Sequence, residues 1–153
     1  MKIAITGSTG LVGSALAERL RDAGHEVLRI QRGRPESGGT WDPATGWIEP
    51  RAFDGVDAVV HLSGASIGDG RWTASRKQVL RSSRIDSTRL LVEHFAQMER
   101  RPRVFVCASA VGIYGDRGDE VLSETSERGS GFLADLVVEW EAEARKAEAL
   151  GMR

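Results

Sequence analysis

The stretch at the start of the chain, MKIAITGSTGLVG, constrains the fold more than any other part of the sequence. Residues 2–6 are mostly apolar and β-branched and end at a glycine, which predicts a short buried strand. Apolar residues then recur at helical spacing as far as Ala23, and Gly24 ends the predicted helix. The chain therefore opens with a strand, a glycine-containing loop and a helix in direct succession.

The loop between this strand and this helix contains Gly7, Gly10 and Gly13, and each glycine has its own steric role. Gly7 permits a tight turn, Gly10 lets the main chain approach a pyrophosphate, and Gly13 lets the helix pack closely against the strand. The free N–H groups of the helix would face the phosphates. The spacing is Gly-x-x-Gly-x-x-Gly rather than the commoner Gly-x-Gly-x-x-Gly, and an ordinary turn is the alternative. The flanking strand and helix favour a dinucleotide cradle.

The rest of the chain alternates between predicted strands and predicted helices. Further strands are expected at 25–30, 57–64 and 103–109, and helices at 75–99 and 132–150. The longer helix has an expected apolar stripe formed by Leu80, Leu90, Leu91, Phe95 and Met98. Residues 33–39 read as a loop, and 40–50 as a small strand–turn–strand or an irregular excursion. This order predicts an α/β fold, a Rossmann-type doubly wound parallel sheet with right-handed crossovers.

The end of the chain bears on domain organisation. Gly151, Met152 and Arg153 stand where the next strand of such a fold should begin. We therefore expect residues 1–153 to be one nucleotide-binding domain that is C-terminally incomplete, the N-terminal part of a longer architecture.

The composition fits a single globular domain and argues against several other classes of protein. The net charge of -1 comes from 21 basic and 22 acidic residues, so no basic field favours nucleic acid as a partner. No apolar run approaches the roughly 18 residues that would indicate a membrane span. The single Cys107 fits a reducing compartment, and we expect a cytoplasmic protein. The histidines His25, His61 and His94 and the lone cysteine show no metal-ligand spacing, so no metal is expected.

The end of the second predicted strand indicates which dinucleotide the cradle would take. A carboxylate there binds the ribose hydroxyls of NAD, whereas an arginine accommodates the 2′-phosphate of NADP. The sequence at this point reads Gln31, Arg32, Gly33, with no acidic residue. NADP is therefore expected rather than NAD, the alternative being that Arg32 is an ordinary solvated arginine.

Several motifs resemble the extended or atypical short-chain dehydrogenase/reductase superfamily. They are TGSTGLVG, DAVVHLSGAS, SRIDSTRLL and SAVGIYG. A narrower resemblance, to the group called epimerase family proteins (NAD-dependent epimerase/dehydratase-like), rests on TWDPATG, HLSGASIGDGRWT and FLADLVVEWEAEA. It covers essentially the whole chain. Members of that group are about twice as long, with a C-terminal substrate-side region that this sequence lacks.

The resemblance implies a cofactor footprint made of four segments. The residues at the pyrophosphate would be Gly7, Thr9, Gly10, Leu11, Val12 and Gly13. Those at the adenosine phosphate would be Gln31 and Arg32, and those along the ribose Leu62, Ser63 and Gly64. Arg84, from the long helix, would be a further contact.

The proton relay that is usual in short-chain dehydrogenases is absent from this sequence. That relay uses a serine or threonine, a tyrosine, and a lysine four residues after the tyrosine, which lowers the tyrosine pKa. The only tyrosine is Tyr114, and Gly118 stands four residues after it. At the expected place, Phe132 or Leu133 stands for the tyrosine, and the lysine position holds Leu136 or Val137. None of these side chains can titrate.

Other side chains could replace the missing relay. The serine position falls on Ser109 or Ala110, and Asp135 lies one helical turn before Glu139. Ser109 and Asp135 are therefore the weak catalytic candidates, although a solvated acidic helix face is the alternative for Asp135.

Two further residues are candidates for substrate binding. Arg71 and Trp72 could clamp an anionic or planar substrate, or they could belong to a loop that packs against the missing half. His61 lies in the apolar run VVHLSG and is expected to be a core imidazole.

Two hypotheses of function follow from these residues. The first is an NADP(H)-binding oxidoreductase or epimerase that acts on an unidentified small molecule with a non-standard acid–base set. The second is a cofactor-binding sensor or scaffold without turnover, for which the small molecule is an effector. The oligomeric state is left open, and a homo-oligomer fits either hypothesis.

Overall fold

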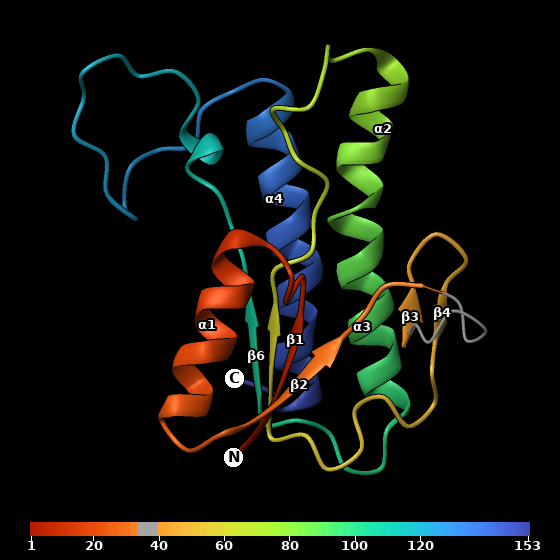
Figure 1. The fold of residues 1–153 in the computed structure, drawn as a ribbon. Helices are drawn as coiled ribbons and strands as arrows, with labels where there is room; N and C mark the ends of the chain where they lie inside the picture. Colours follow the sequence, from red (N-terminus) through yellow and green to blue (C-terminus); the bar gives the residue numbers. More distant parts are fainter. Residues whose placement is uncertain (34–39) are drawn as a thin grey trace.

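The computed structural model describes residues 1–33 and 40–153 and contains a parallel four-stranded sheet (Figure 1). The sheet order is β2 (Glu26–Ile30), β1 (Lys2–Thr6), β5 (Ala58–His61), β6 (Val104–Cys107). Ile3 pairs with Val27 on one side and with Ala58 on the other, and all neighbouring strands run parallel. The predicted parallel α/β sheet is confirmed. Most of the loop expected at 33–39 lies outside the described residues.

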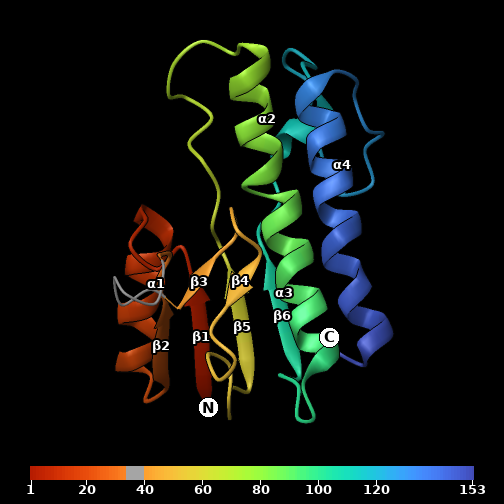
Figure 2. The ribbon, with the colours of Figure 1, turned by 90° about the vertical axis from the view of Figure 1, so that its right-hand side faces the viewer.

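Helices cover both faces of this sheet. Helix α1 (Leu11–Asp22) lies on one face, and α3 (Ile85–Gln97) and α4 (Phe132–Arg145) lie on the other (Figure 2). The alternation of side chains along β1 explains the two cores. Ile3 and Ile5 pack toward α1, whereas Ala4 joins the core that contains Leu91 and Phe95 of α3.

The helix predicted over 75–99 is wrong at its middle, because the structure breaks it into α2 (Ala74–Ser82) and α3. The main chain at Arg84 departs from helical geometry, with φ -113° and ψ -59°. The Ser83 hydroxyl accepts a hydrogen bond of 3.0 Å from the Ala65 N–H and so joins the break to the segment after β5. The predicted apolar stripe is confirmed: Leu80, Leu91 and Phe95 are fully buried.

The segment 40–50 forms the predicted strand–turn–strand. It consists of β3 (Trp41–Asp42) and β4 (Trp47–Ile48), which pair antiparallel. The hairpin packs on the α3 side of the sheet, where Trp41 is buried and its ring meets the imidazole of His61 edge-on at 5.8 Å.

The C-terminal segment differs in detail from the single helix predicted over 132–150. Helix α4 ends at Arg145, and the 3-10 helix η3 (Lys146–Leu150) follows it. The Arg153 N–H then donates to the Arg103 carbonyl at 2.9 Å, and its carbonyl accepts from the Phe105 N–H at 2.8 Å. The last residue therefore lies along the outer edge of β6. Within the described residues, no helix is both long and apolar enough to span a bilayer.

Candidate functional site

The candidate site lies at the edge of the sheet where the parallel strands end. Because β1, β5 and β6 run in the same direction, the loops that follow them meet at one edge, which is where open α/β sheets bind ligands. The segments that meet there are the glycine loop, residues 62–73 and residues 108–115, which includes the 3-10 helix η2 (Val111–Tyr114) (Figure 1).

Two of the three glycines are required by the fold itself. Gly7 has φ +67°, and a Cβ atom there would lie 2.8 Å from the carbonyl carbon of Leu62. A Cβ atom at Gly13 would lie only 2.3 Å from the carbonyl oxygen of Gly7. Both positions therefore exclude any side chain, as the sequence predicts for a tight turn and for close helix packing.

Gly10 differs from its two neighbours because the fold alone does not require it. Its φ of -73° is open to any residue, and the nearest atom to a Cβ placed there is the Gly7 carbonyl oxygen, at 3.4 Å. Gly10 is also exposed. The main chain at this point has no side chain over it and is therefore accessible to a ligand that approaches the loop closely.

The N-terminus of α1 points its first N–H groups toward the same space. Gly10 is the N-cap, no side chain caps the helix, and the first turn contains no acidic residue. The Ser14 hydroxyl donates to the Gly10 carbonyl rather than accepting from an N–H. Unpartnered N–H groups and the positive end of the helix dipole together suit an anion such as a pyrophosphate. Thr9 is exposed beside them, as are the side chains of Leu11 and Val12, at 90% and 64%.

Gln31 and Arg32 follow β2, at the outer end of the same sheet edge, and both are exposed. The Gln31 N–H donates to the Thr40 hydroxyl at 2.9 Å, and the Gln31 carbonyl accepts from the Thr40 N–H at 2.9 Å. The main chain of Arg32 forms an isolated parallel β-bridge with that of Trp41. These contacts fix the main chain and leave the Arg32 side chain accessible to a ligand.

Leu62, Ser63 and Gly64 leave the sheet, so that β5 is shorter than the predicted strand 57–64. The main chain of Leu62 and Ser63 lies against Gly7, and Arg84 lies against Gly64. A Cβ atom at Gly64 would be 3.2 Å from the guanidinium carbon of Arg84. The structure therefore brings the residues implied at the pyrophosphate and along the ribose into one continuous surface, with Arg84 at its border.

The two weak catalytic candidates are already engaged by charged neighbours. The Ser109 hydroxyl donates to Glu141 of α4 at 2.5 Å, and Asp135 pairs with Arg128 at 2.6 Å. Leu136 and Val137, at the lysine position, are buried in the core. Roles for Ser109 and Asp135 in chemistry stay predictions.

Arg71 and Trp72 lie on the loop before α2, and both are exposed. The Trp72 indole N–H donates to the Ile67 carbonyl at 3.0 Å, and its ring meets Phe132 edge-on at 5.8 Å. Lys77 lies over the other ring of this pair, 5.2 Å from the Phe132 centroid. The loop thus offers an aromatic surface bordered by cations. A substrate clamp and packing against a missing region both stay predictions for Arg71 and Trp72.

His61 is a core residue, as expected. It is fully buried, and its Nδ1 atom shares a hydrogen bond of 2.6 Å with the Thr6 hydroxyl. Burial lowers the pKa of His61 to about 3, so the imidazole is neutral near pH 7. Across residues 1–33 and 40–153, no group of three or more His, Cys, Asp or Glu side chains could hold a metal ion.

Arg76, which the sequence reasoning did not consider, lies beside the segment after β5. One guanidinium N–H donates to the Ser66 carbonyl, while the buried Nε has no hydrogen-bond partner within the described residues. The one sequence signal for Arg76 was its spacing of about two helical turns from Arg84. The break at Ser83, which separates the two residues, could not be predicted from the sequence.

Comparison with known proteins agrees with this geometry. The model of the NAD dependent epimerase/dehydratase family matches residues 3–149. An epimerase family protein of Mycobacterium bovis is 44% identical over 153 residues, which are 99% of this chain and 50% of the relative. The chain therefore spans about half the length of the curated relatives that it matches.

Solved structures give the same result. A nucleoside-diphosphate sugar epimerase from Corynebacterium glutamicum is 41% identical with a TM-score of 0.81, covering 100% of this chain and 32% of that one. A human epimerase family protein crystallised with NADPH is 29% identical with a TM-score of 0.76, over 95% of this chain and 49% of that one. The resemblance seen in the sequence motifs is confirmed, and the chain belongs to the NAD-dependent epimerase/dehydratase family.

Proposed function

We propose that this chain binds NADP(H) at the glycine loop and forms the coenzyme-binding part of an oxidoreductase or epimerase that acts on a small molecule. The proposal rests mainly on the backbone geometry and surroundings of Gly10. This residue has ordinary backbone geometry and space around it, so neither backbone strain nor a steric clash requires a glycine there. Close approach of a pyrophosphate to the main chain does give a reason for one.

The preference for the phosphorylated coenzyme rests on Arg32. An exposed guanidinium follows β2, with Gln31 and Gly33 as its neighbours, and residues 30–33 contain no carboxylate that could bind the ribose hydroxyls of NAD. Arginine can form paired, charge-assisted hydrogen bonds with a phosphate. The human relative that was crystallised with NADPH supports the same choice.

Under this proposal, the chain's own contribution is to bind and orient the coenzyme, which itself supplies hydride chemistry. The N–H groups at the start of α1 would hold the pyrophosphate. The main chain of Leu62 and Ser63, packed against Gly7, would form the floor beside the ribose. Ser109 and Asp135 are the side chains of this chain proposed to take part in proton transfer.

The test compares two glycine-to-alanine variants by titration with NADPH. Gly10→Ala should lower the free energy of unfolding by no more than about 1 kcal/mol, the cost of alanine at an N-cap. It should nevertheless weaken NADPH binding by roughly 10- to 100-fold, because the added methyl occupies the approach path. Gly13→Ala should destabilise the fold by about 1–3 kcal/mol, because its Cβ meets the Gly7 carbonyl. Unchanged NADPH affinity in a folded Gly10→Ala variant would refute the proposal.

A second candidate function, coenzyme binding without turnover, is favoured by one specific observation. The Ser109 hydroxyl and the Asp135 carboxylate both have charged partners, and no side chain at the tyrosine and lysine positions can titrate. Incubation of the protein with C4-deuterated NADPH and a cellular metabolite extract separates the two functions. Net reduction moves deuterium into a metabolite, and epimerisation, which is redox-neutral, is detected instead as the appearance of a diastereomer of a metabolite in the same extract. Binding alone gives neither result.

A further inference from the structure

A row of three buried polar side chains joins the end of β1 to the break between α2 and α3. The Thr6 hydroxyl, one residue before Gly7, lies 2.6 Å from Nδ1 of His61. On the other side of the ring, Nε2 of His61 lies 3.3 Å from the Ser87 hydroxyl of α3. All three side chains are fully buried. The glycine loop and the break are therefore linked through the core by hydrogen bonds and not by apolar packing alone.

The proton of the Ser87 hydroxyl is used at the break. The hydroxyl donates to the Ser83 carbonyl at 2.8 Å and to the Arg84 carbonyl at 3.1 Å, and both distances are shorter than the one to His61. A hydroxyl has a single proton, so toward the imidazole the Ser87 oxygen acts as the acceptor. The donor in this contact is therefore the Nε2–H group of His61.

The Thr6 hydroxyl leads to the same assignment from the other end. Within residues 1–33 and 40–153 it forms no hydrogen bond except the one to Nδ1, so its proton has no other acceptor in the core. Thr6 therefore donates and Nδ1 accepts. A neutral imidazole has one donor nitrogen and one acceptor nitrogen, which is what the two hydroxyls require.

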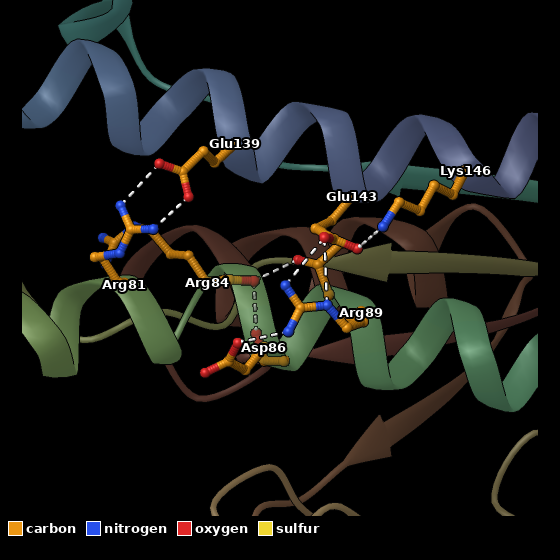
Figure 3. A network of polar contacts seen from close by, with 9 residues as sticks. Arg81, Arg84, Asp86, Arg89, Glu139, Glu143 and Lys146 are labelled. Atoms are coloured by element: carbon orange, nitrogen blue, oxygen red, sulfur yellow. Dashed lines mark hydrogen bonds and ion pairs between the residues drawn. The ribbon is translucent and has the colours of Figure 1, made fainter.

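The break that Ser87 contacts carries Arg84, one of the residues implied at the coenzyme. Helices α2 and α3 are each held to α4 by an ion pair, and Arg84 lies between these pairs (Figure 3). Its guanidinium lies against Gly64, whereas its own hydrogen bond, to the Leu80 carbonyl, stays within α2 and is long at 3.4 Å. The contact between His61 and Ser87 therefore helps to set where Arg84 lies relative to the ends of β1 and β5.

We propose that His61, as its Nε2–H tautomer, is a positioning residue of the coenzyme site. It holds the break that carries Arg84 at a fixed place relative to the glycine loop, so that both can contact one coenzyme molecule. This inference rests on the proposed function, in which the glycine loop binds the pyrophosphate and Arg84 is a further coenzyme contact.

The first test determines the tautomer in the unmodified protein without ligand. Long-range nitrogen–proton NMR correlations of the imidazole ring at pH 7 distinguish a protonated ring nitrogen from an unprotonated one. We expect Nε2 to carry the proton and Nδ1 to carry none. The opposite tautomer, or a doubly protonated ring, would overturn the assignment.

The second test is a double-mutant cycle read out by NADPH titration. Arg84→Gln should weaken NADPH binding by about 10-fold in the unmodified protein, but by no more than about 3-fold in Ser87→Ala, where the break has lost its link to His61. If Ser87 only stabilised the fold, the effect of Arg84→Gln would be the same in both backgrounds, and the inference would be wrong. Ser87→Cys takes the place of Ser87→Ala if the latter does not fold, because a thiol is a weak acceptor.

The matched control is Ser82→Ala, which removes an exposed hydroxyl that donates only to the Val79 carbonyl of its own helix. It should leave the effect of Arg84→Gln unchanged. The Arg84 Nε–H resonance, recorded without coenzyme, should move in the Ser87 variant and not in Ser82→Ala, and an unmoved resonance in a folded Ser87 variant would overturn the positioning role. Failure of NADPH to bind would refute the proposed function instead, because neither NMR measurement requires the coenzyme.

Discussion

Gly10 and Arg32 lie at the two ends of the proposed coenzyme site, and each would have its own role there. Gly10 lacks a side chain, so the proposed pyrophosphate could approach its main chain. Arg32 supplies an exposed positive charge just after β2. The first affects every dinucleotide equally, because every one has a pyrophosphate. The second affects only a coenzyme that has a phosphate on the adenosine ribose.

Replacing Arg32 should therefore change coenzyme preference. Arg32→Ala is expected to weaken NADPH binding by roughly 10- to 100-fold through the loss of charge-assisted hydrogen bonds, and to change NADH binding less than about 2-fold. Fluorescence titration with both coenzymes measures this. The control is Arg29→Ala, which removes an exposed arginine within β2 itself. Equal losses for NADPH and NADH would contradict the role given to Arg32.

His61 makes the stability of the protein depend on pH. The folded state keeps this imidazole neutral down to a pKa of about 3, whereas the unfolded chain binds the proton near 6.5. Between these values the unfolded state holds more protons, so the free energy of unfolding should fall by about 1.4 kcal/mol for each unit of decreasing pH. Burial also lowers the pKa of His94, which adds to the slope in the same direction.

Urea denaturation between pH 7 and pH 5 measures this slope. In His61→Phe the aromatic contacts with Trp41 and Phe105 can persist while the titrating group is gone. The variant should therefore lose most of the pH dependence, even if its stability at pH 7 is lower. A slope as steep as that of the unmodified protein would show that burial of His61 is not its source.

At the scale of elements, two ion pairs join α2 and α3 to α4, and they differ in burial. The Arg81 and Glu139 side chains are 37% and 44% exposed, whereas the Glu143 side chain is only 11% exposed and binds both Arg89 and Lys146. An exposed pair contributes little, but loss of a nearly buried carboxylate leaves its cations without partners.

Glu143→Ala should therefore destabilise the protein by about 1–3 kcal/mol, and Glu139→Ala by less than about 1 kcal/mol. Urea denaturation at pH 7 compares the two variants directly. Since both substitutions remove a glutamate from the same helix, helix propensity cancels between them. Equal losses would mean that burial does not distinguish the two contacts.

The elements also show how far the sequence allows prediction. The strand, glycine loop and helix at the start were predictable because Gly7 and Gly13 have steric reasons to be glycine and the apolar period is strong. The break at Ser83 was not, because no glycine or proline marks it. It accompanies a hydrogen bond from Ala65, eighteen residues earlier in the chain. Arg84 follows that break, so its contact with Gly64 could not be predicted from the sequence.

For the whole molecule, helices cover both faces of the sheet, and the loops after β1, β5 and β6 gather at one edge (Figure 2). A ligand bound there contacts several loops and stabilises only the folded state. Under the proposed function, coenzyme binding would therefore stabilise the entire sheet rather than one loop.

Saturation with NADPH should consequently raise the thermal midpoint. At about 100 times the dissociation constant the expected stabilisation is about 2.7 kcal/mol. This corresponds to roughly 5–10 °C for a chain of this size. Calorimetry with and without NADPH measures the shift, and the folded Gly10→Ala variant should show little of it. A chain whose midpoint does not respond to saturating NADPH would not have the coenzyme site proposed here.

The floor of the proposed coenzyme site consists of main-chain atoms in the glycine loop and after β5. Gly7 lies against the main chain of Leu62, and Gly13 lies against the carbonyl oxygen of Gly7. Main-chain atoms are common to all residues, so under the proposed function this part of the pyrophosphate site would be largely insensitive to side-chain substitution. Coenzyme choice would, by contrast, depend on the exposed side chains of Gln31 and Arg32 at the rim. An engineer who wished to convert the protein from one nicotinamide coenzyme to the other would therefore need to edit only that rim, and could leave the floor untouched.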